Sequence, residues 1–187
     1  MTDAAWQKSS RDFLFGYVKA RYPILRPVLF WLERSRPGVY ETLTRPAEDG
    51  TVFDLGGRAL KCIHFPGHSP GSLILSDERT KTLYVGDAVN KGLFLFFEGS
   101  PPLKEYAARL RDLARLSGYD RIWDSHSEKP LPFSFIGYYA DFLERAALEK
   151  SVKSDIPNGG NDVYIYKEAG DKFELPSIEV FYTKNLL

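Results

Sequence analysis

The sequence has little cysteine, little histidine and no long apolar run. Cys62 is the only cysteine among 187 residues, so the chain cannot form an internal disulfide bond and suits a reducing compartment. The most apolar early stretch, residues 22–32, is interrupted by Pro23, Arg26 and Pro27, and a membrane helix needs about 20 apolar residues. The first residues lack the basic region and cleavage site of a signal peptide. We therefore expect a cytoplasmic protein that does not cross a membrane.

An excess of charge of either sign is also missing. The 25 Lys and Arg residues balance the 25 Asp and Glu residues, without a long run of one sign. Composition thus predicts neither a nucleic-acid surface nor a polybasic membrane anchor, and a small-molecule substrate is the expected partner. Hydrophobic residues make up 43% of the chain and aromatic residues 14%, which is enough to build the core of one globular domain.

The chain divides into two parts by the period of its apolar residues. Residues 1–49 are predicted to be a helical segment, with Ser10 capping one helix and Pro27 opening a second, and this segment would form the wall or cap of a pocket. From Thr51 the period changes from helical to two, which indicates strands. Residues 50–187 are therefore treated as the main domain.

Strands and helices alternate in the second part, which predicts an α/β (α+β) fold. Gly56 and Gly57 supply the tight turn of a first hairpin. Helices are predicted at 101–117, with Ser100 as the cap, and at 135–150. The predicted strands are 52–55, 58–65, 72–75, 82–85, 121–123, 163–167, 172–175 and 178–183.

Three polar features follow predicted strands, where sheets commonly place their functional groups. They are the loop from His64 to Ser72 with His68 at its centre, the pair Gly86-Asp87, and the run Asp124-Ser125-His126. Imidazole and carboxylate groups are preferred ligands of Zn²⁺ after thiolate. A metal site is one interpretation of this pattern, and hydrogen-bonded structural histidines are the other.

The order of these features resembles the second half of the metallo-β-lactamase superfamily, over about residues 50–150. The motif His-x-Pro-Gly-His-Ser-Pro-Gly-Ser is followed by a hairpin, Leu-Tyr-Val-Gly-Asp, a helix and a strand ending in Ser-His. The resemblance implies that His68 binds a first metal ion, that Asp87 bridges two ions and acts in catalysis, and that His126 binds the second ion. The implied cofactor is zinc, as one or two ions in a complete family member.

The same resemblance implies a fold and a reaction. The fold would be a partial αββα metallo-β-lactamase sandwich, mainly its second β-sheet with the covering helices, and residues 50–187 would be the carboxyl-terminal half of the domain. The reaction would be cleavage of an ester, thioester, lactone or amide bond by a metal-bound hydroxide. Zn²⁺ lowers the pKa of a bound water to about 7, which suits this chemistry.

The sequence departs from the family in one important respect. Family members carry His-x-His-x-Asp-His upstream, whereas this chain has only three histidines and none lies before His64. Each metal ion would keep one histidine plus Asp87, so we expect weak metal binding. The chain is then expected to be truncated, or to depend on self-association or on a separate amino-terminal half. The alternative is a metal-free, non-catalytic remnant or interaction protein.

A missing first sheet would also leave apolar strand positions without their usual cover. We expect Leu73, Leu75 and Val85 to lack their usual cover in this way. The amino-terminal helices could cover part of this face, with Phe13, Tyr17, Leu29 and Trp31, and a second copy or a separate amino-terminal half could dock there; association is the favoured alternative.

Four nearby residues are interpreted as structural. His64 is predicted to pack in the core or beside the site, and Cys62, on the same strand face, to be buried and inert. Asp124 is predicted to cap the loop that carries His126. The pattern Gly-x-Ser-x-Gly around Ser69 precedes a strand, whereas a serine-hydrolase elbow precedes a helix, so we reject a serine nucleophile.

Overall fold

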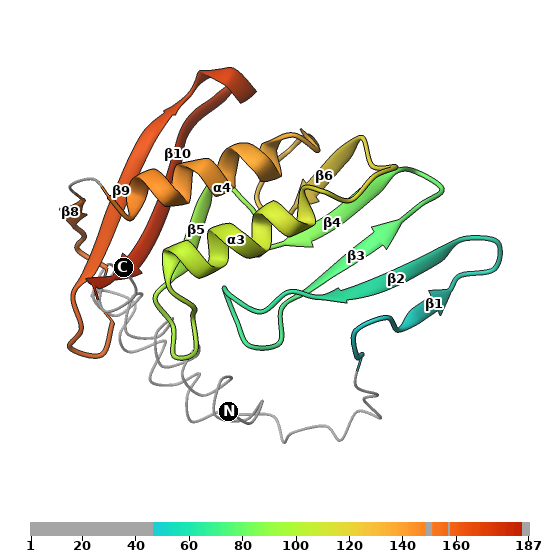
Figure 1. Cartoon of the computed structure of the whole chain (residues 1–187), viewed down its shortest axis with the longest axis horizontal. Coiled ribbons are helices and arrows are strands. Elements are labelled where there is room, and N and C mark those ends of the chain that lie inside the picture. Colours follow the sequence, from blue (N-terminus) through green and yellow to red (C-terminus); the bar gives the residue numbers. More distant parts are fainter. Residues whose placement is uncertain (1–46, 149–150, 157, 185–187) are drawn as a thin grey trace, which may run out of the picture.

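The structure of the protein, a computed structural model, describes residues 47–148, 151–156 and 158–184. The predicted helical segment 1–49 falls almost entirely outside these residues and stays a prediction. The described part contains two β-sheets and two long helices that lie side by side (Figure 1). This arrangement confirms the predicted mixed α/β fold and corresponds to a partial αββα sandwich.

The larger sheet has six strands in the order β1-β2-β3-β4-β6-β7. Its strands are β1 (Val52–Asp54), β2 (Ala59–His64), β3 (Leu73–Asp77), β4 (Thr82–Gly86), β6 (Arg121–Asp124) and β7 (Leu131–Pro132). Strands β1 to β4 pair antiparallel in sequence order, whereas β4 and β6 pair in parallel. A parallel pair needs a crossover connection, and here that connection contains a helix.

The smaller sheet has four strands in the order β5-β10-β9-β8. They are β5 (Gly92–Leu95), β8 (Val152–Lys153), β9 (Val163–Gly170) and β10 (Leu175–Thr183). The predicted strand 172–175 is wrong, because η2 (Asp171–Phe173) is a 3₁₀ turn and Glu174 adopts a left-handed conformation with φ of 56°. The chain needs this tight turn to reverse direction between the two antiparallel strands.

The helices are shorter than the sequence predicted. Helix α3 spans Leu103–Leu113 and α4 spans Phe135–Ala146. Pro102 occupies the N-cap of α3 in an extended conformation, so the prediction of Ser100 as the cap is wrong. The Ser100 hydroxyl instead donates a hydrogen bond of 3.0 Å to the carbonyl of Gly67, in the loop that carries His68.

The core lies between these helices, one face of the larger sheet and buried residues of the smaller sheet. Ile74, Leu83 and Val85 are fully buried there and belong to the same cluster as the inward faces of α3 and α4. Val85 is thus covered by the protein's own helices, and the expectation that it lacks its usual cover is wrong. Leu73 and Leu75 are half-buried on the opposite face of the sheet, where the expected association surface stays a prediction.

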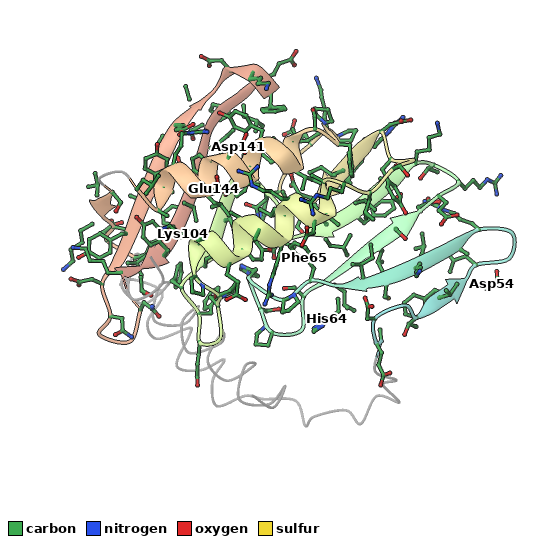
Figure 2. The ribbon with its side chains drawn as sticks, viewed as in Figure 1. Asp54, His64, Phe65, Lys104, Asp141 and Glu144 are labelled. Carbon is green, nitrogen blue, oxygen red and sulfur yellow. The ribbon has the colours of Figure 1, made fainter. Side chains whose placement is uncertain are left out.

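Ion pairs also connect the two helices. Arg111 of α3 forms ion pairs of 2.8 Å with Asp141 and 2.6 Å with Glu144 of α4, whose positions Figure 2 labels. Neither helix in the described ranges is long and apolar enough to cross a membrane.

A buried carboxylate closes the hairpin between β3 and β4. The Asp77 side chain is inaccessible to solvent and accepts hydrogen bonds of 2.8 Å from Nε of Arg58 and 2.6 Å from the Thr80 hydroxyl. Burial alone would raise the pKa of the Asp77 carboxyl, but the hydrogen bonds from Thr80 and Arg58 outweigh it and hold this pKa below its usual value. The ionised carboxylate therefore stabilises the turn.

Replacing Asp77 tests this role. Asp77→Ala leaves the backbone N–H of Thr80 and the guanidinium of Arg58 without their acceptor, so we expect the free energy of unfolding in urea to fall by about 2 to 3 kcal/mol. The control is Asp120→Ala, which removes an exposed partner of Lys81 at 3.9 Å and should cost less than about 0.5 kcal/mol. Equal losses in the two variants would contradict the assignment.

The same carboxylate predicts a pH dependence. Because the pKa of Asp77 is lower in the folded protein than in the unfolded chain, its stabilisation is complete above the unfolded value of about 3.9 and is lost as the pH falls through the folded value. The stability difference between the wild type and Asp77→Ala should therefore be constant from about pH 5 to 7 and shrink below about pH 4. Urea titrations at several pH values measure it, and a difference that grows on acidification would refute it.

Candidate metal centre

The topology brings the three predicted ligands to one edge of the larger sheet. β2 is antiparallel to β3 and β3 to β4, so β2 and β4 run in the same direction, and β6 is parallel to β4. The carboxyl ends of these strands therefore face the same edge. His68, Asp87 and His126 follow them along the chain, each in the loop after its strand.

Gly86 directs Asp87 out of the sheet. Its φ of +53° is a backbone conformation that residues other than glycine rarely adopt. The pairing between β4 and β6 is irregular at this point. The turn places the Asp87 carboxylate between two imidazole rings. Its Oδ2 lies 3.8 Å from Nε2 of His68, and its Oδ1 lies 2.8 Å from Nε2 of His126.

One oxygen of Asp87 is left without a hydrogen-bond donor. Oδ1 is shielded from solvent and accepts no hydrogen bond within the described ranges. Its distance of 2.8 Å from His126 Nε2 is that of an ion pair, but the two groups are not oriented as a hydrogen bond. A buried acceptor without a donor is costly, and a cation would compensate it.

The ring of His68 is held in one tautomer. Its Nδ1 lies 3.1 Å from the carbonyl oxygen of Phe94, which only accepts hydrogen bonds, so Nδ1 carries the proton and Nε2 presents a lone pair toward Asp87. Phe97 packs edge-on against the ring at 5.3 Å. Burial lowers the pKa of His68 below its ordinary value despite the neighbouring Asp87 carboxylate, which keeps the ring neutral as metal coordination requires.

The loop that carries His126 is capped by Asp124, as the sequence predicted. The Asp124 carboxylate accepts hydrogen bonds of 2.7 Å from the backbone N–H groups of His126 and Ser127, and a third from the Ser127 hydroxyl. Asp124 is buried, whereas the His126 side chain is 58% exposed. The backbone of this loop is therefore fixed while the imidazole remains accessible.

Tyr106 of α3 connects two of the three loops, a role that the sequence did not reveal. The ring lies against Gly67, where an added Cβ would stand 2.0 Å from Tyr106 Cε2. Its hydroxyl donates a hydrogen bond of 2.8 Å to the carbonyl of Ala88. One fully buried side chain thus contacts the residue before His68 and the residue after Asp87. In the sequence, Tyr106 is only one of several apolar residues on a helix face, which gave no signal of this function.

Arg109 provides a second connection between α3 and the His68 loop. Its guanidinium donates a hydrogen bond of 2.8 Å to the carbonyl of Pro66. The backbone on the amino-terminal side of His68 is thereby anchored to the helix at Pro66 as well as at Gly67.

His64 and Cys62, which the sequence predicted to be structural, are not among the three clustered side chains. His64 is exposed, so packing in the core is wrong, but its Nε2 lies 3.1 Å from the carbonyl oxygen of Pro70 in the His68 loop, so the alternative of a place beside the site stays a prediction. Figure 2 labels His64 beside Phe65, the next residue, which is buried and packs against Tyr106. Cys62 is fully buried, as predicted.

The residues present fit a cation between carboxylate and imidazole, but only with few ligands. The lone pair of His68 Nε2 faces a carboxylate oxygen at 3.8 Å, and two zinc ligands of one tetrahedral site are about 3.4 Å apart. Within residues 47–148, 151–156 and 158–184, however, no set of three His, Cys, Asp or Glu side chains is arranged to hold one ion. His68 and His126 instead form two pairs that share Asp87.

Curated proteins with similar sequences are acyl-coenzyme A thioesterases named MBLAC2. The Bos taurus protein is 33% identical over 139 residues, which is 74% of this chain and 46% of the relative. The Homo sapiens protein is 33% identical over 109 residues, which is 58% of this chain and 37% of the relative. The chain thus spans less than half the length of the curated relatives it matches.

Solved structures with a similar fold are more distant in sequence. A metallo-β-lactamase family protein from Thermus thermophilus is 22% identical, with a TM-score of 0.43 over 71% of this chain and 50% of that chain. A β-lactamase domain protein from Burkholderia ambifaria is 21% identical, with a TM-score of 0.47 over 64% of this chain and 38% of that chain.

The family itself is established by a family model. The model of the metallo-β-lactamase superfamily matches residues 3–126, which include the His68 loop, Asp87 and His126. The chain therefore belongs to the metallo-β-lactamase superfamily.

Proposed function

We propose that the chain carries part of the site of a metal-dependent hydrolase that cleaves a thioester bond. His68, Asp87 and His126 are the proposed metal ligands, and zinc is the proposed ion. The observation that carries the proposal is the buried, unpartnered Oδ1 of Asp87, which lies beside two imidazole groups. A carboxylate in this position needs a cation, and no Lys or Arg in the described part of the chain makes an ion pair with it.

Each ligand makes its own contribution to such a site. The neutral His68 ring offers a lone pair on a fixed axis, because the Phe94 carbonyl holds the opposite nitrogen. Asp87 supplies the negative charge and an oxygen toward each histidine. His126 is the most exposed of the three and thus lies on the side that a substrate reaches. A bound zinc ion would supply Lewis acidity and a water with a pKa near about 7.

Two observations support an acyl thioester as the substrate. The curated relatives are named as acyl-coenzyme A thioesterases. In addition, the half-buried side chain of Phe97 packs against the His68 ring at 5.3 Å, where it offers an apolar surface for an acyl group. The unpaired Cys62 supports a reducing, cytoplasmic location for this chemistry.

The small number of proposed ligands favours a site that is completed by further protein ligands. Each proposed ion would have one histidine and a share of Asp87, whereas catalytic zinc sites have three protein ligands. The remaining ligands would come from a separate amino-terminal half or from self-association. The lack of a three-ligand set in the described residues also favours a second candidate function, a metal-free and non-catalytic interaction protein.

Zinc titration separates the two candidates. We expect the purified chain to bind Zn²⁺ weakly in isothermal titration calorimetry, and Asp87→Ala to lower the affinity more than about 100-fold, since even partners that only orient a ligand contribute about 10- to 100-fold. The matched control is Asp112→Ala, which removes an exposed carboxylate of α3 that pairs with Arg115, and it should bind like the wild type. Equal binding by the wild type and Asp87→Ala would support the metal-free function.

Thioester hydrolysis tests the reaction. Release of free thiol from palmitoyl-coenzyme A in saturating Zn²⁺ should be slow for the chain alone, because a metal ion with few ligands binds weakly. This activity should disappear with a chelator, in Asp87→Ala and in His126→Ala, and should persist in Asp112→Ala. Thiol release that survives both chelator and Asp87→Ala would refute the proposed mechanism.

A further inference from the structure

A cavity opens directly beside His126. It has a volume of about 540 Å³, within the range of about 300 to 1,000 Å³ that ligand pockets occupy. One wall is the loop from His126 to Pro132, and another is formed by η2 and the beginning of β10. The cavity therefore extends the proposed site on the side of its most accessible ligand.

Lysines dominate the charge of this cavity. Lys91, Lys129 and Lys172 come from three different segments and all line it. In the described part of the chain none of the three ammonium groups pairs with a carboxylate, although eight other lysine and arginine residues there do. Lys172 lies over the rings of Tyr138 at 5.2 Å and Phe173 at 5.6 Å, which fixes its position.

The rest of the lining is mixed. Glu128 and Glu174 contribute two carboxylates, which leaves a small positive excess. Apolar walls are formed by Pro130, Leu131, Pro132, Phe173, Leu175 and Pro176. A ligand that suits this lining carries several negative charges for the lysines, hydrogen-bond donors for the carboxylates, and a flat or apolar part for the proline and phenylalanine side chains.

We infer that this cavity binds the phosphate-bearing nucleotide part of a coenzyme A thioester. Its phosphates match the lysines, its ribose hydroxyl and adenine amino groups match Glu128 and Glu174, and its base matches the apolar wall. The position beside His126 brings the thiol end of the ligand close to the proposed metal centre, where Phe97 packs against the His68 ring and offers an apolar surface for the acyl group. This inference rests on the proposed thioesterase function for its choice of ligand.

Binding of free coenzyme A tests the cavity without any turnover. We expect isothermal titration calorimetry to detect coenzyme A binding by the wild-type chain, with at least about a 10-fold loss of affinity in the double variant Lys91→Ala/Lys129→Ala. The matched control is Lys61→Ala/Lys104→Ala, which removes two exposed lysines that do not line the cavity (Lys104 is labelled in Figure 2) and should bind like the wild type. Unchanged melting temperatures would show that both variants fold.

Several results would overturn the inference. They are no binding of coenzyme A, the same loss in both double variants, or an undiminished affinity in Lys91→Ala/Lys129→Ala. Binding that depends on the cavity lysines without any thioester hydrolysis would support the cavity and reject the proposed reaction. Conversely, hydrolysis of palmitoyl-coenzyme A with the same KM in the cavity variant and the wild type would support the reaction and reject the cavity.

Discussion

The candidate site depends on the packing of one buried side chain, Tyr106, between two loops. Its ring occupies the space that a Cβ at residue 67 would need, and its hydroxyl satisfies the carbonyl of Ala88. Burial raises the pKa of Tyr106 well above its ordinary value, so the hydroxyl stays a hydrogen-bond donor. His68 and Asp87 are thus fixed relative to each other by the core and not only by their own contact.

The electrostatics of the site are set by the carboxylate of Asp87 and the neutral ring of His68. The carboxylate of Asp87 has one shielded oxygen without a donor, and its neighbour His68 is kept neutral by burial. Two electron-pair donors that face each other repel unless a cation lies between them. The same loops that pack tightly on α3 therefore hold an arrangement that is unfavourable by itself. Such unfavourable arrangements are typical of functional sites in otherwise well-packed proteins.

The cavity beside His126 is the proposed binding site for part of the substrate. Its lysines come from the segment before β5, from the loop after β6 and from η2, and β7 of the larger sheet and β10 of the smaller sheet also contribute to its lining. Glu174 of its lining belongs to the tight left-handed turn before β10. The turn that joins β9 and β10 therefore has two roles, since it reverses the chain and shapes a wall of the cavity.

The sequence by itself predicted the hairpins of the larger sheet, the existence of both helices, and three loop residues that the structure brings together, His68, Asp87 and His126. Alternation, helical spacing and a specific ordered motif are local signals; the role of the three residues as metal ligands stays a prediction. It also identified Asp124 as a cap, since that bond joins neighbours in the chain. Only the tertiary structure decided that Val85 is covered, that Ser100 bonds Gly67, that Tyr106 joins two loops, and that 171–174 is a turn. The first three outcomes depend on contacts between residues distant in the chain, whose energies no local pattern contains.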